Sequence, residues 1–234
     1  LKTQPLKPET QKRRLEAIAA AWKWAVEENL VMANPWTKIP KVDVPDIEGA
    51  HPFTKEECEK ICKAIGELRP CSNFVPFVKF MIGCGSRPGE AIGLRWGDVT
   101  DNFSKVTIRS QFTKGERKAP KKNKIRKFRV STEIQGLLEQ LFLNAQHPTP
   151  EILIFANKGK PIDLDHFRED VWKPALKKAR VTYRPPKNCR HTFVSTMLEA
   201  GVNPVLVSKI TGHDTAVMFK NYAGLLSEPA IPDF

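Results

Sequence analysis

Apolar side chains recur with helical spacing near the start of the chain, over residues 9–32. The positions that share one face are Leu15, Ile18, Ala19, Trp22 and Val26. This spacing predicts an amphipathic helix, which Asn34 and Pro35 then end. The apolar face is large for a lone helix, so we expect it to pack against another part of the protein.

A proline-rich stretch without periodicity follows, "KIPKVDVPDIEGAHP", and we interpret residues 43–52 as a linker. Thr54 then precedes a second helical segment, and Glu57 stands three residues later. This spacing predicts a capping box, in which each side chain binds the backbone N–H of the other residue. We expect the helix to run to about Gly66.

The segment "NFVPFVKFMIGCG" is strongly apolar and predicts a buried helix that ends at a glycine. Directly after it, "SRPGEAIGLRWGDV" predicts another helix, because Pro88 and Glu90 both favour a helix start.

Residues 103–132 change to the alternation typical of strands. The stretches "KVTIRSQF" and "RKFRVST" predict two strands, joined by "TKGERKAPKKNK". Further helices are predicted near residues 132–145 and 165–180, and two short ones in "RHTFVSTMLEAG" and "NPVLVSKITG". The predicted fold class is mainly α with a small antiparallel β-sheet (α+β).

Composition narrows the class of protein. The chain has 234 residues, of which 41% are hydrophobic, enough for a sizeable core. Its five cysteines lack a paired zinc spacing, so we expect reduced thiols in a cytoplasmic protein and no metal site. No apolar run approaches the roughly 20 residues that span a bilayer, so no membrane association is expected.

The formal net charge of +12 favours polyanionic partners, with nucleic acid first. Residues 105–129 hold eleven Lys or Arg and a single acid, Glu116. Most charge runs are solvated surfaces, but here one sign of charge alternates with strand-forming residues. A two-stranded ribbon of this kind can lie along a DNA groove. The candidate DNA-binding residues are Lys114, Arg117, Lys118, Lys121, Lys124, Arg126 and Lys127.

Two arginines occur in the same local setting, each at the start of a helix. Arg87 lies between "GCGS" and "PGEA", and Arg190 is followed at once by His191. A helix N-terminus attracts anions, and a guanidinium adds a planar fork that suits a phosphate. Each arginine alone is more often part of a surface ion pair, whereas the repeated setting favours a shared phosphate site.

The stretch "ITGHDTAVMFKNYAG" places His213 after a helix-ending glycine, and Tyr222 nine positions later. An interpretation without chemistry is available, in which one helical stripe faces the core. That stripe would consist of Val217, Met218, Phe219 and Tyr222. Periodicity alone favours this interpretation over a catalytic one.

The preceding stretch, "STMLEAGVNPVLVSKITGH", has the order helix, turn and helix, which is also typical of DNA-binding regulators. Its second helix is short and apolar. The side chains that could reach base edges are limited to Asn203, Ser208 and Lys209. We therefore expect this helix to pack in the protein and not to read DNA.

Four blocks in this order resemble the tyrosine recombinase family of the phage-integrase type. The blocks are "GCGSRPGEAIGLRWGDV", "PKKNKIRKFRV", "KNCRHTFVSTMLEAG" and "ITGHDTAVMFKNY". The resemblance makes Arg87 and Arg190 the catalytic arginines, His213 the active-site histidine and Tyr222 the nucleophile. It implies the catalytic-domain fold of this family.

The same resemblance assigns further residues. Glu90 and His191 take supporting positions. Lys122 fits the Lys-x-Lys pattern of the catalytic lysine best, and Lys121 and Lys124 are alternatives. Where the family usually has histidine, this sequence has Lys187, which is placed among the catalytic residues because lysine can bind a phosphate as a point charge.

The resemblance implies site-specific DNA recombination without a metal or other cofactor, as in the integration and excision of a phage or mobile element. Tyr222 would attack a phosphate to form a 3′-phosphotyrosyl bond, with the lysine as general acid. His213 would orient the phosphate and assist proton removal from Tyr222. The expected partners are double-stranded DNA with a specific recombination site and further copies of the chain, from dimer to tetramer.

The resemblance also implies a domain organisation. Residues 1–42 would be the C-terminal part of a truncated core-binding domain and residues 53–234 the catalytic domain. Two other functions stay open: a type IB topoisomerase-like enzyme with the same phosphotyrosine chemistry, and a non-catalytic helix-turn-helix regulator.

Overall fold

The structure is a computed structural model that divides into two compact units, Leu1–Glu48 and Gly49–Phe234. It describes residues 6–38, 42–43, 51–69, 71–113, 115–120, 125–214, 216, 218 and 222. Several residues singled out above lie outside the described residues: Lys114, Lys121, Lys122, Lys124, Val217 and Phe219. Within the described ranges, no helix is long and apolar enough to cross a membrane.

The described residues of the first unit form one helix, α1 (Pro8–Glu27), which ends earlier than its apolar pattern predicts. The chain turns at Asn29, whose φ of 55° is left-handed, and the N–H of Leu30 donates to the carbonyl oxygen of Ala25 at 2.8 Å. Asparagine adopts this conformation more readily than most residues, which explains the stop before Asn34. Among the described residues of this unit, the predicted apolar face holds no buried side chain.

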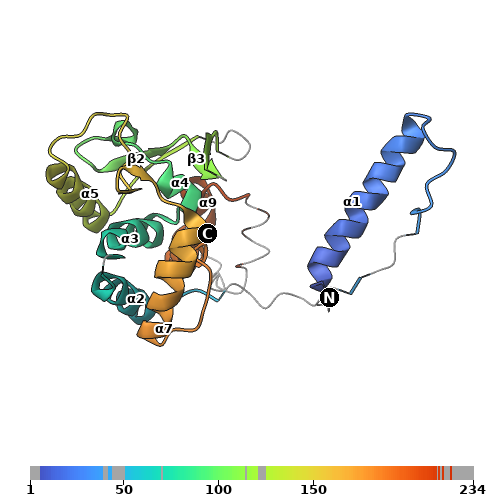
Figure 1. Ribbon diagram of the computed structural model, residues 1–234. Helices are drawn as coiled ribbons and strands as arrows, with labels where there is room; N and C mark the ends of the chain where they lie inside the picture. Colours follow the sequence, from blue (N-terminus) through green and yellow to red (C-terminus); the bar gives the residue numbers. More distant parts are fainter. Residues whose placement is uncertain are drawn as a thin grey trace, which may run out of the picture. The chain divides into compact units, whose positions relative to one another are not determined.

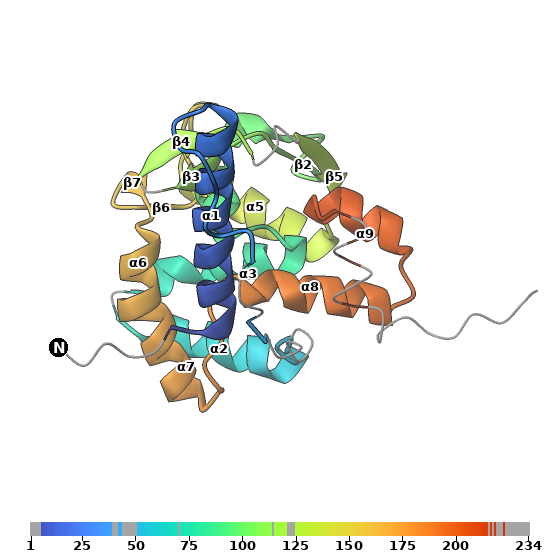
Figure 2. The same cartoon turned by 90° about the vertical axis from the view of Figure 1, so that its right-hand side faces the viewer.

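The second unit is mainly helical. Its longer helices are α2 (Lys55–Glu67), α3 (Val75–Cys84), α5 (Thr132–Asn144), α7 (Lys173–Ala179), α8 (Asn188–Glu199) and α9 (Pro204–Thr211). Short helical segments are η1 (Cys71–Phe74), α4 (Pro88–Ile92), η2 (Trp96–Asp98), α6 (Leu164–His166) and the π-helical η4 (Phe167–Trp172). Helices α2 and α7 pack together, as do α3 and α8, and α9 lies against the strand labelled β5 (Figures 1 and 2).

The predicted capping box of α2 is confirmed. The N–H of Glu57 donates to Thr54 Oγ1 at 3.2 Å, and the N–H of Thr54 donates to Glu57 Oε2 at 3.0 Å. The predicted glycine end of α3 is also confirmed, since Gly85 has a φ of 59°. A Cβ at Gly85 would overlap the ring of Phe193, so a glycine here also lets α3 and α8 approach closely.

Three small antiparallel sheets accompany the helices. The strands are β1 (Val99–Thr100), β2 (Lys105–Ile108), β3 (Gln111–Thr113), β4 (Glu116–Lys118), β5 (Arg126–Arg129), β6 (Ala156–Asn157) and β7 (Lys160–Pro161). The sheets have the orders β1-β2-β5, β3-β4 and β6-β7. The predicted pair of strands is observed as β2 and β5, but the segment between them also folds, because β3 and β4 form a hairpin there.

Two apolar clusters of described residues form the core of this unit. The larger one contains aromatic side chains in edge-to-face contact, such as Phe77 and Phe167, whose ring centres lie 5.3 Å apart at an angle of 89°. The smaller one consists of Val194, Leu198, Val207, Met218 and Tyr222. Tyr222 therefore occupies the core position that its periodicity predicts.

Candidate active site

Glu90, in the first turn of α4, organises a cluster of arginines. Its side chain is fully buried. Arg87, the residue before α4, donates its backbone N–H to Glu90 Oε2 at 2.8 Å and its Nη1 to Oε1 at 2.7 Å. Arg126 on β5 donates Nη1 to Oε1 at 3.0 Å and Nη2 to Oε2 at 2.6 Å. One carboxylate thus fixes two guanidinium groups from distant parts of the sequence.

The charge state of Glu90 follows from these contacts. Burial favours the neutral acid, but the hydrogen bonds and charge of Arg126, followed by those of Arg87, outweigh burial and lower the pKa of Glu90 to about 2. Glu90 is therefore an anion at neutral pH and compensates part of the positive charge in the cluster.

Arg126 does not lie where we expected it, on the DNA-binding surface. Its side chain is 8% exposed, and its Nε donates to the carbonyl oxygen of Ile210 at 2.7 Å. In the register of the sheet it stands opposite Ile108, on the same face as the buried Phe128. Strand alternation in "RKFRV" was a signal for this inward position, since residues 126 and 128 must share a face.

Arg190 in the first turn of α8 reaches the same cluster. Its Nη1 donates to the carbonyl oxygen of Gly85 at 3.0 Å and lies 4.0 Å from Glu90 Oε2. Its Nε donates to His213 Nε2 at 3.1 Å. Its Nη2 is buried, and no described residue accepts a hydrogen bond from it. Burial, followed by the charge of Arg87, lowers the pKa of Arg190 to about 9, so the group is still a cation at neutral pH.

His213 is held through both ring nitrogens. Nε2 accepts from Arg190, and Nδ1 lies 3.1 Å from Thr211 Oγ1, which itself donates to the carbonyl oxygen of Val207 at 2.7 Å. This chain of bonds requires the proton on Nδ1. Burial, followed by the charges of Arg190 and Arg87, lowers the pKa of His213 to about 3, so the ring is neutral. No sequence signal pointed to Thr211.

The hydroxyl group of Tyr222 contacts a second histidine, His191. Its hydroxyl oxygen lies 2.5 Å from Nδ1 of His191, the residue after Arg190. The ring centre of Tyr222 lies 6.0 Å from that of His191 and 6.5 Å from that of His213, so both rings are beside it. Burial, offset in part by Arg190, raises the pKa of Tyr222 to about 12. Burial, followed by Lys187 and Arg190, lowers the pKa of His191, so at neutral pH a neutral imidazole faces a protonated phenol.

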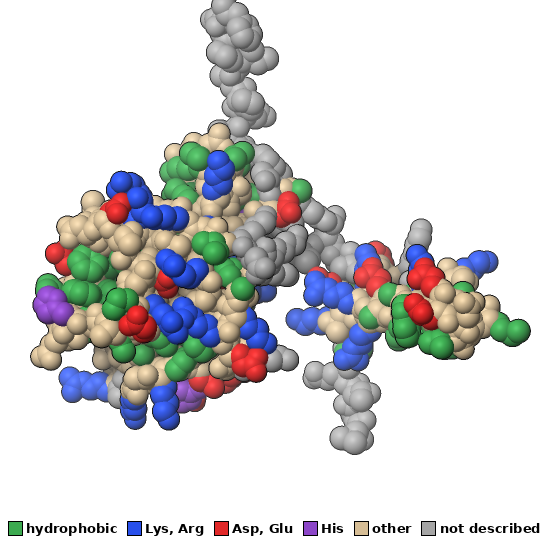
Figure 3. Space-filling model, turned by 90° about the horizontal axis from the view of Figure 1, so that it is seen from above, with side chains coloured by type: hydrophobic (Ala, Val, Ile, Leu, Met, Phe, Trp, Pro, Cys, Tyr) green, Lys and Arg blue, Asp and Glu red, His purple; other side chains and the backbone are tan. Residues whose placement is uncertain are grey.

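The remaining sequence-predicted residues lie outside this cluster. Lys187 is exposed just before α8. On the β3-β4 hairpin, Arg117 is partly buried and donates to Ser110 Oγ at 2.9 Å, whereas Lys118 pairs with Glu116 at 2.7 Å. Lys127 is exposed on β5. Figure 3 views the second unit from the side of its strands and shows Lys and Arg side chains gathered across that face.

The second helix of the helix-turn-helix-like segment, α9, packs against α8 and β5, as we predicted. The Asn203 side chain caps α9 by accepting from the N–H of Val205 at 2.8 Å. Ser208 is buried and donates to the carbonyl oxygen of Val205 at 2.8 Å. Two of the three side chains considered for base contacts are thus used within α9 itself.

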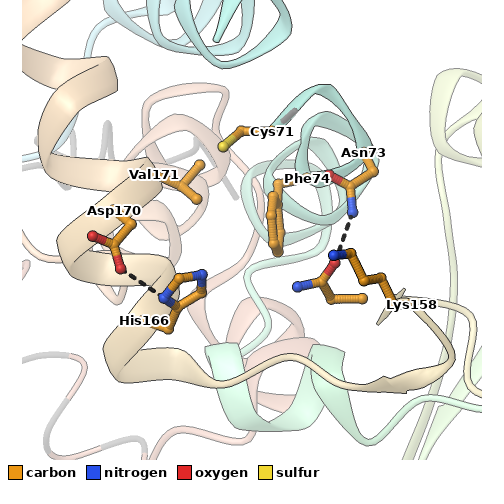
Figure 4. A pocket seen from close by; sticks show the side chains of 8 residues that line it. Cys71, Asn73, Phe74, Lys158, His166, Asp170 and Val171 are labelled. Carbon is orange, nitrogen blue, oxygen red and sulfur yellow. Dashed lines mark hydrogen bonds and ion pairs between the residues drawn. The ribbon is translucent and has the colours of Figure 1, made fainter. Parts of the chain in front are cut away.

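A separate pocket of about 360 Å³ lies between η1, the β6-β7 hairpin and η4 (Figure 4). Phe74 and Val171 line it with apolar surface, and an ion pair of 2.6 Å joins His166 to Asp170 at its rim. None of its lining residues belongs to the predicted site, so it is not part of the arginine cluster.

The cluster is suited to bind an oxyanion next to a phenol. Three guanidinium groups share one carboxylate, and a buried N–H of Arg190 points to no acceptor. A bound phosphate would supply that acceptor and neutralise the surplus charge. Among the described residues, no group of three or more His, Cys, Asp or Glu side chains could hold a metal ion.

Comparisons with known proteins identify the family of this chain. Residues 52–228 match the sequence pattern of the phage integrase family. Prophage integrase IntR of Escherichia coli (strain K12) is 28% identical over 232 residues, covering 89% of this chain and 55% of that protein. A tyrosine recombinase XerC-like protein of Caldanaerobacter subterraneus subsp. tengcongensis is 28% identical over 234 residues, covering 85% and 57%. The chain thus spans a little over half the length of these relatives.

Solved structures show the same fold. The Tn1549 transposon integrase, in complex with transposon right end DNA, superposes with a TM-score of 0.77 at 20% identity, covering 96% of this chain and 77% of that one. The catalytic domain of bacteriophage HP1 integrase superposes with a TM-score of 0.54 at 19% identity. The predicted fold class is confirmed. Because the family description matches most of the sequence, the chain belongs to the phage integrase family of tyrosine recombinases and includes its catalytic-domain region.

Proposed function

We propose that this chain is the catalytic part of a site-specific DNA recombinase that cuts and rejoins strands through Tyr222. The observation that carries the proposal is the buried, unpartnered Nη2 of Arg190, in a cluster that also holds Arg87 and faces Tyr222. A scissile phosphate fits there because its non-bridging oxygens accept hydrogen bonds that the protein leaves unmade.

In this proposal the phenol oxygen of Tyr222 attacks phosphorus, the bond to the 5′ oxygen breaks, and a 3′-phosphotyrosyl link forms. Arg87 and Arg190 stabilise the charge on the non-bridging oxygens in the transition state, and Glu90 keeps both groups in place. His213 orients Arg190 through its Nε2, and its ring lies beside the ring of Tyr222, with centres 6.5 Å apart. A lysine of the stretch 121–124, Lys122 first and Lys121 or Lys124 as alternatives, protonates the leaving oxygen.

The partners belong to the same proposal. The solved relatives include a transposon integrase bound to transposon end DNA and a lambda integrase dimer bound to a core site. For this chain we propose double-stranded DNA with a specific recombination site, and assembly of two to four copies on it. Residues 1–42 would be the last part of a core-binding domain on the same DNA, joined through the linker at 43–52.

The test is covalent trapping. Duplexes are first enriched from a random-sequence library by binding to the purified chain, and the selected sequence is then made with a nick at each successive position. A cut next to a nick releases a short fragment, so the adduct accumulates. We expect a slower band on a denaturing gel in EDTA, lost in Tyr222→Phe. DNA binding without an adduct at any nick position would favour the regulator and contradict the proposal.

A further inference from the structure

We propose that His191 takes the proton of Tyr222 during strand cleavage and returns it during rejoining. This inference rests on the proposed recombinase function and adds a residue to its chemistry. The contact that carries it joins the hydroxyl oxygen of Tyr222 to Nδ1 of His191 at 2.5 Å, across 31 residues of sequence. A general base must lie within hydrogen-bond reach of the proton it removes, and His191 does.

The other candidate bases in this region are either hydrogen-bonded to other groups or exposed to solvent. Both ring nitrogens of His213 already have partners, Arg190 at Nε2 and Thr211 at Nδ1. Lys187, at the position where the family usually has histidine, is exposed just before α8. His191 lies in the first turn of α8, four residues after Lys187, and contacts the phenol directly.

The electrostatics of the site make this step depend on DNA. The described groups that face the His191–Tyr222 pair are Lys187, Arg190 and the neutral ring of His213. Without DNA, the two cations oppose a protonated His191. A bound phosphate places a negative charge beside the pair and offsets them, so the imidazole becomes a better proton acceptor when the substrate arrives.

The step balances in both directions. The O–H bond of Tyr222 breaks as its O–P bond forms, and the proton passes to Nδ1 of His191. The bond from phosphorus to the 5′ oxygen breaks, and that oxygen receives a separate proton from the lysine that acts as general acid. In rejoining, a 5′-hydroxyl attacks phosphorus and gives its proton to that lysine, the bond from phosphorus to the tyrosyl oxygen breaks, and Nδ1 of His191 returns its proton to the tyrosyl oxygen.

The experiment compares His191→Asn and His191→Ala with wild type on the nicked, selected duplexes. Asparagine can accept a hydrogen bond but cannot take up a proton at these pH values. We expect cleavage to slow by about 10²- to 10⁴-fold in both variants, with unchanged DNA binding in a gel-shift assay. Imidazole added to His191→Ala should restore part of the rate. The matched control is His166→Asn, an exposed histidine paired with Asp170, which should cleave at the wild-type rate.

The pH profile separates this role from a structural one. The wild-type rate should rise with pH as His191 loses its proton and then level off, and His191→Asn should lack that rise. Wild-type rates in His191→Asn, or loss of the rise in Lys187→Gln instead, would overturn the proposal. If His191→Asn does not fold, imidazole rescue of His191→Ala decides, and the absence of rescue counts against the role. Failure of the proposed function is a different result, because wild type itself would then form no adduct.

Discussion

At the scale of single residues, Glu90 is the group on which the site depends. It is fully buried, and two guanidinium groups form hydrogen bonds with it. Replacing it by Gln leaves Arg126 buried without a counter-charge. We expect Glu90→Gln to lower the free energy of unfolding by about 3–5 kcal/mol, measured by urea denaturation. Glu116→Gln, on the exposed β3-β4 hairpin, is the control and should change it by less than about 0.5 kcal/mol.

The same carboxylate predicts a pH dependence of stability. The pKa of Glu90 is lowered in the folded state to about 2, against about 4.3 for an unfolded chain. Its stabilising effect is therefore complete above pH 4.3 and is lost as pH falls towards 2. The difference in unfolding free energy between wild type and Glu90→Gln should shrink over this range. A difference that stays constant between pH 5 and pH 2.5 would contradict the lowered pKa.

Tyr222 offers a direct titration, because the chain has only two tyrosines. In Tyr183→Phe, the ultraviolet absorbance of phenolate reports Tyr222 alone. We expect a pKa of about 12 in the folded chain, because burial disfavours the phenolate. The same variant in denaturant is the control and should titrate near 10. A folded-state value at or below 10 would show that the phenol is ionised more easily than its burial implies.

At the scale of elements, one kind of substitution should have three different outcomes. Gly136 lies in the exposed part of α5, with open space around it. We therefore expect Gly136→Ala to raise the free energy of unfolding by about 0.5–1 kcal/mol. Gly201 also has open space around it, but its φ is 75°. Backbone strain in Gly201→Ala should therefore lower the free energy of unfolding by about 1–2 kcal/mol. Gly85→Ala combines a φ of 59° with overlap on Phe193, and we expect the largest loss. Thermal unfolding of the three variants measures this order, and a stable Gly85→Ala would mean that α3 and α8 can separate.

At the scale of the whole molecule, the charge of +12 predicts DNA binding that weakens steeply with salt. Each lysine that contacts a phosphate contributes about one unit to the slope of log affinity against log salt. We expect Lys127→Gln to reduce that slope by about one on a random-sequence duplex, measured by fluorescence anisotropy. Lys178→Gln, on α7 and paired with Glu67 at 2.8 Å, is the charge-matched control and should keep the wild-type slope. Equal slopes for all three proteins would place the DNA away from β5.

Much of the architecture could be predicted from local sequence. The capping box at Thr54 and the glycine ends of α3 and α9 need only residues a few positions apart, and each is observed. The early end of α1 and the β3-β4 hairpin were missed. In both cases, a turn residue (Asn29 or Gly115) adopts a left-handed conformation that apolar periodicity does not report.

The sequence by itself placed Arg87 and Arg190 at helix starts, and the four blocks that resemble the tyrosine recombinase family predicted Arg87, Arg190, His213 and Tyr222 as a set. Only the tertiary structure decided how they are joined. Arg126 binds Glu90 across 36 residues, and His191 binds Tyr222 across 31. Local sequence patterns do not predict such pairs. Side-chain spacing determines the face of an element on which a residue lies, but not which other element packs against that face. The buried carboxylate and the short histidine contact are products of that packing.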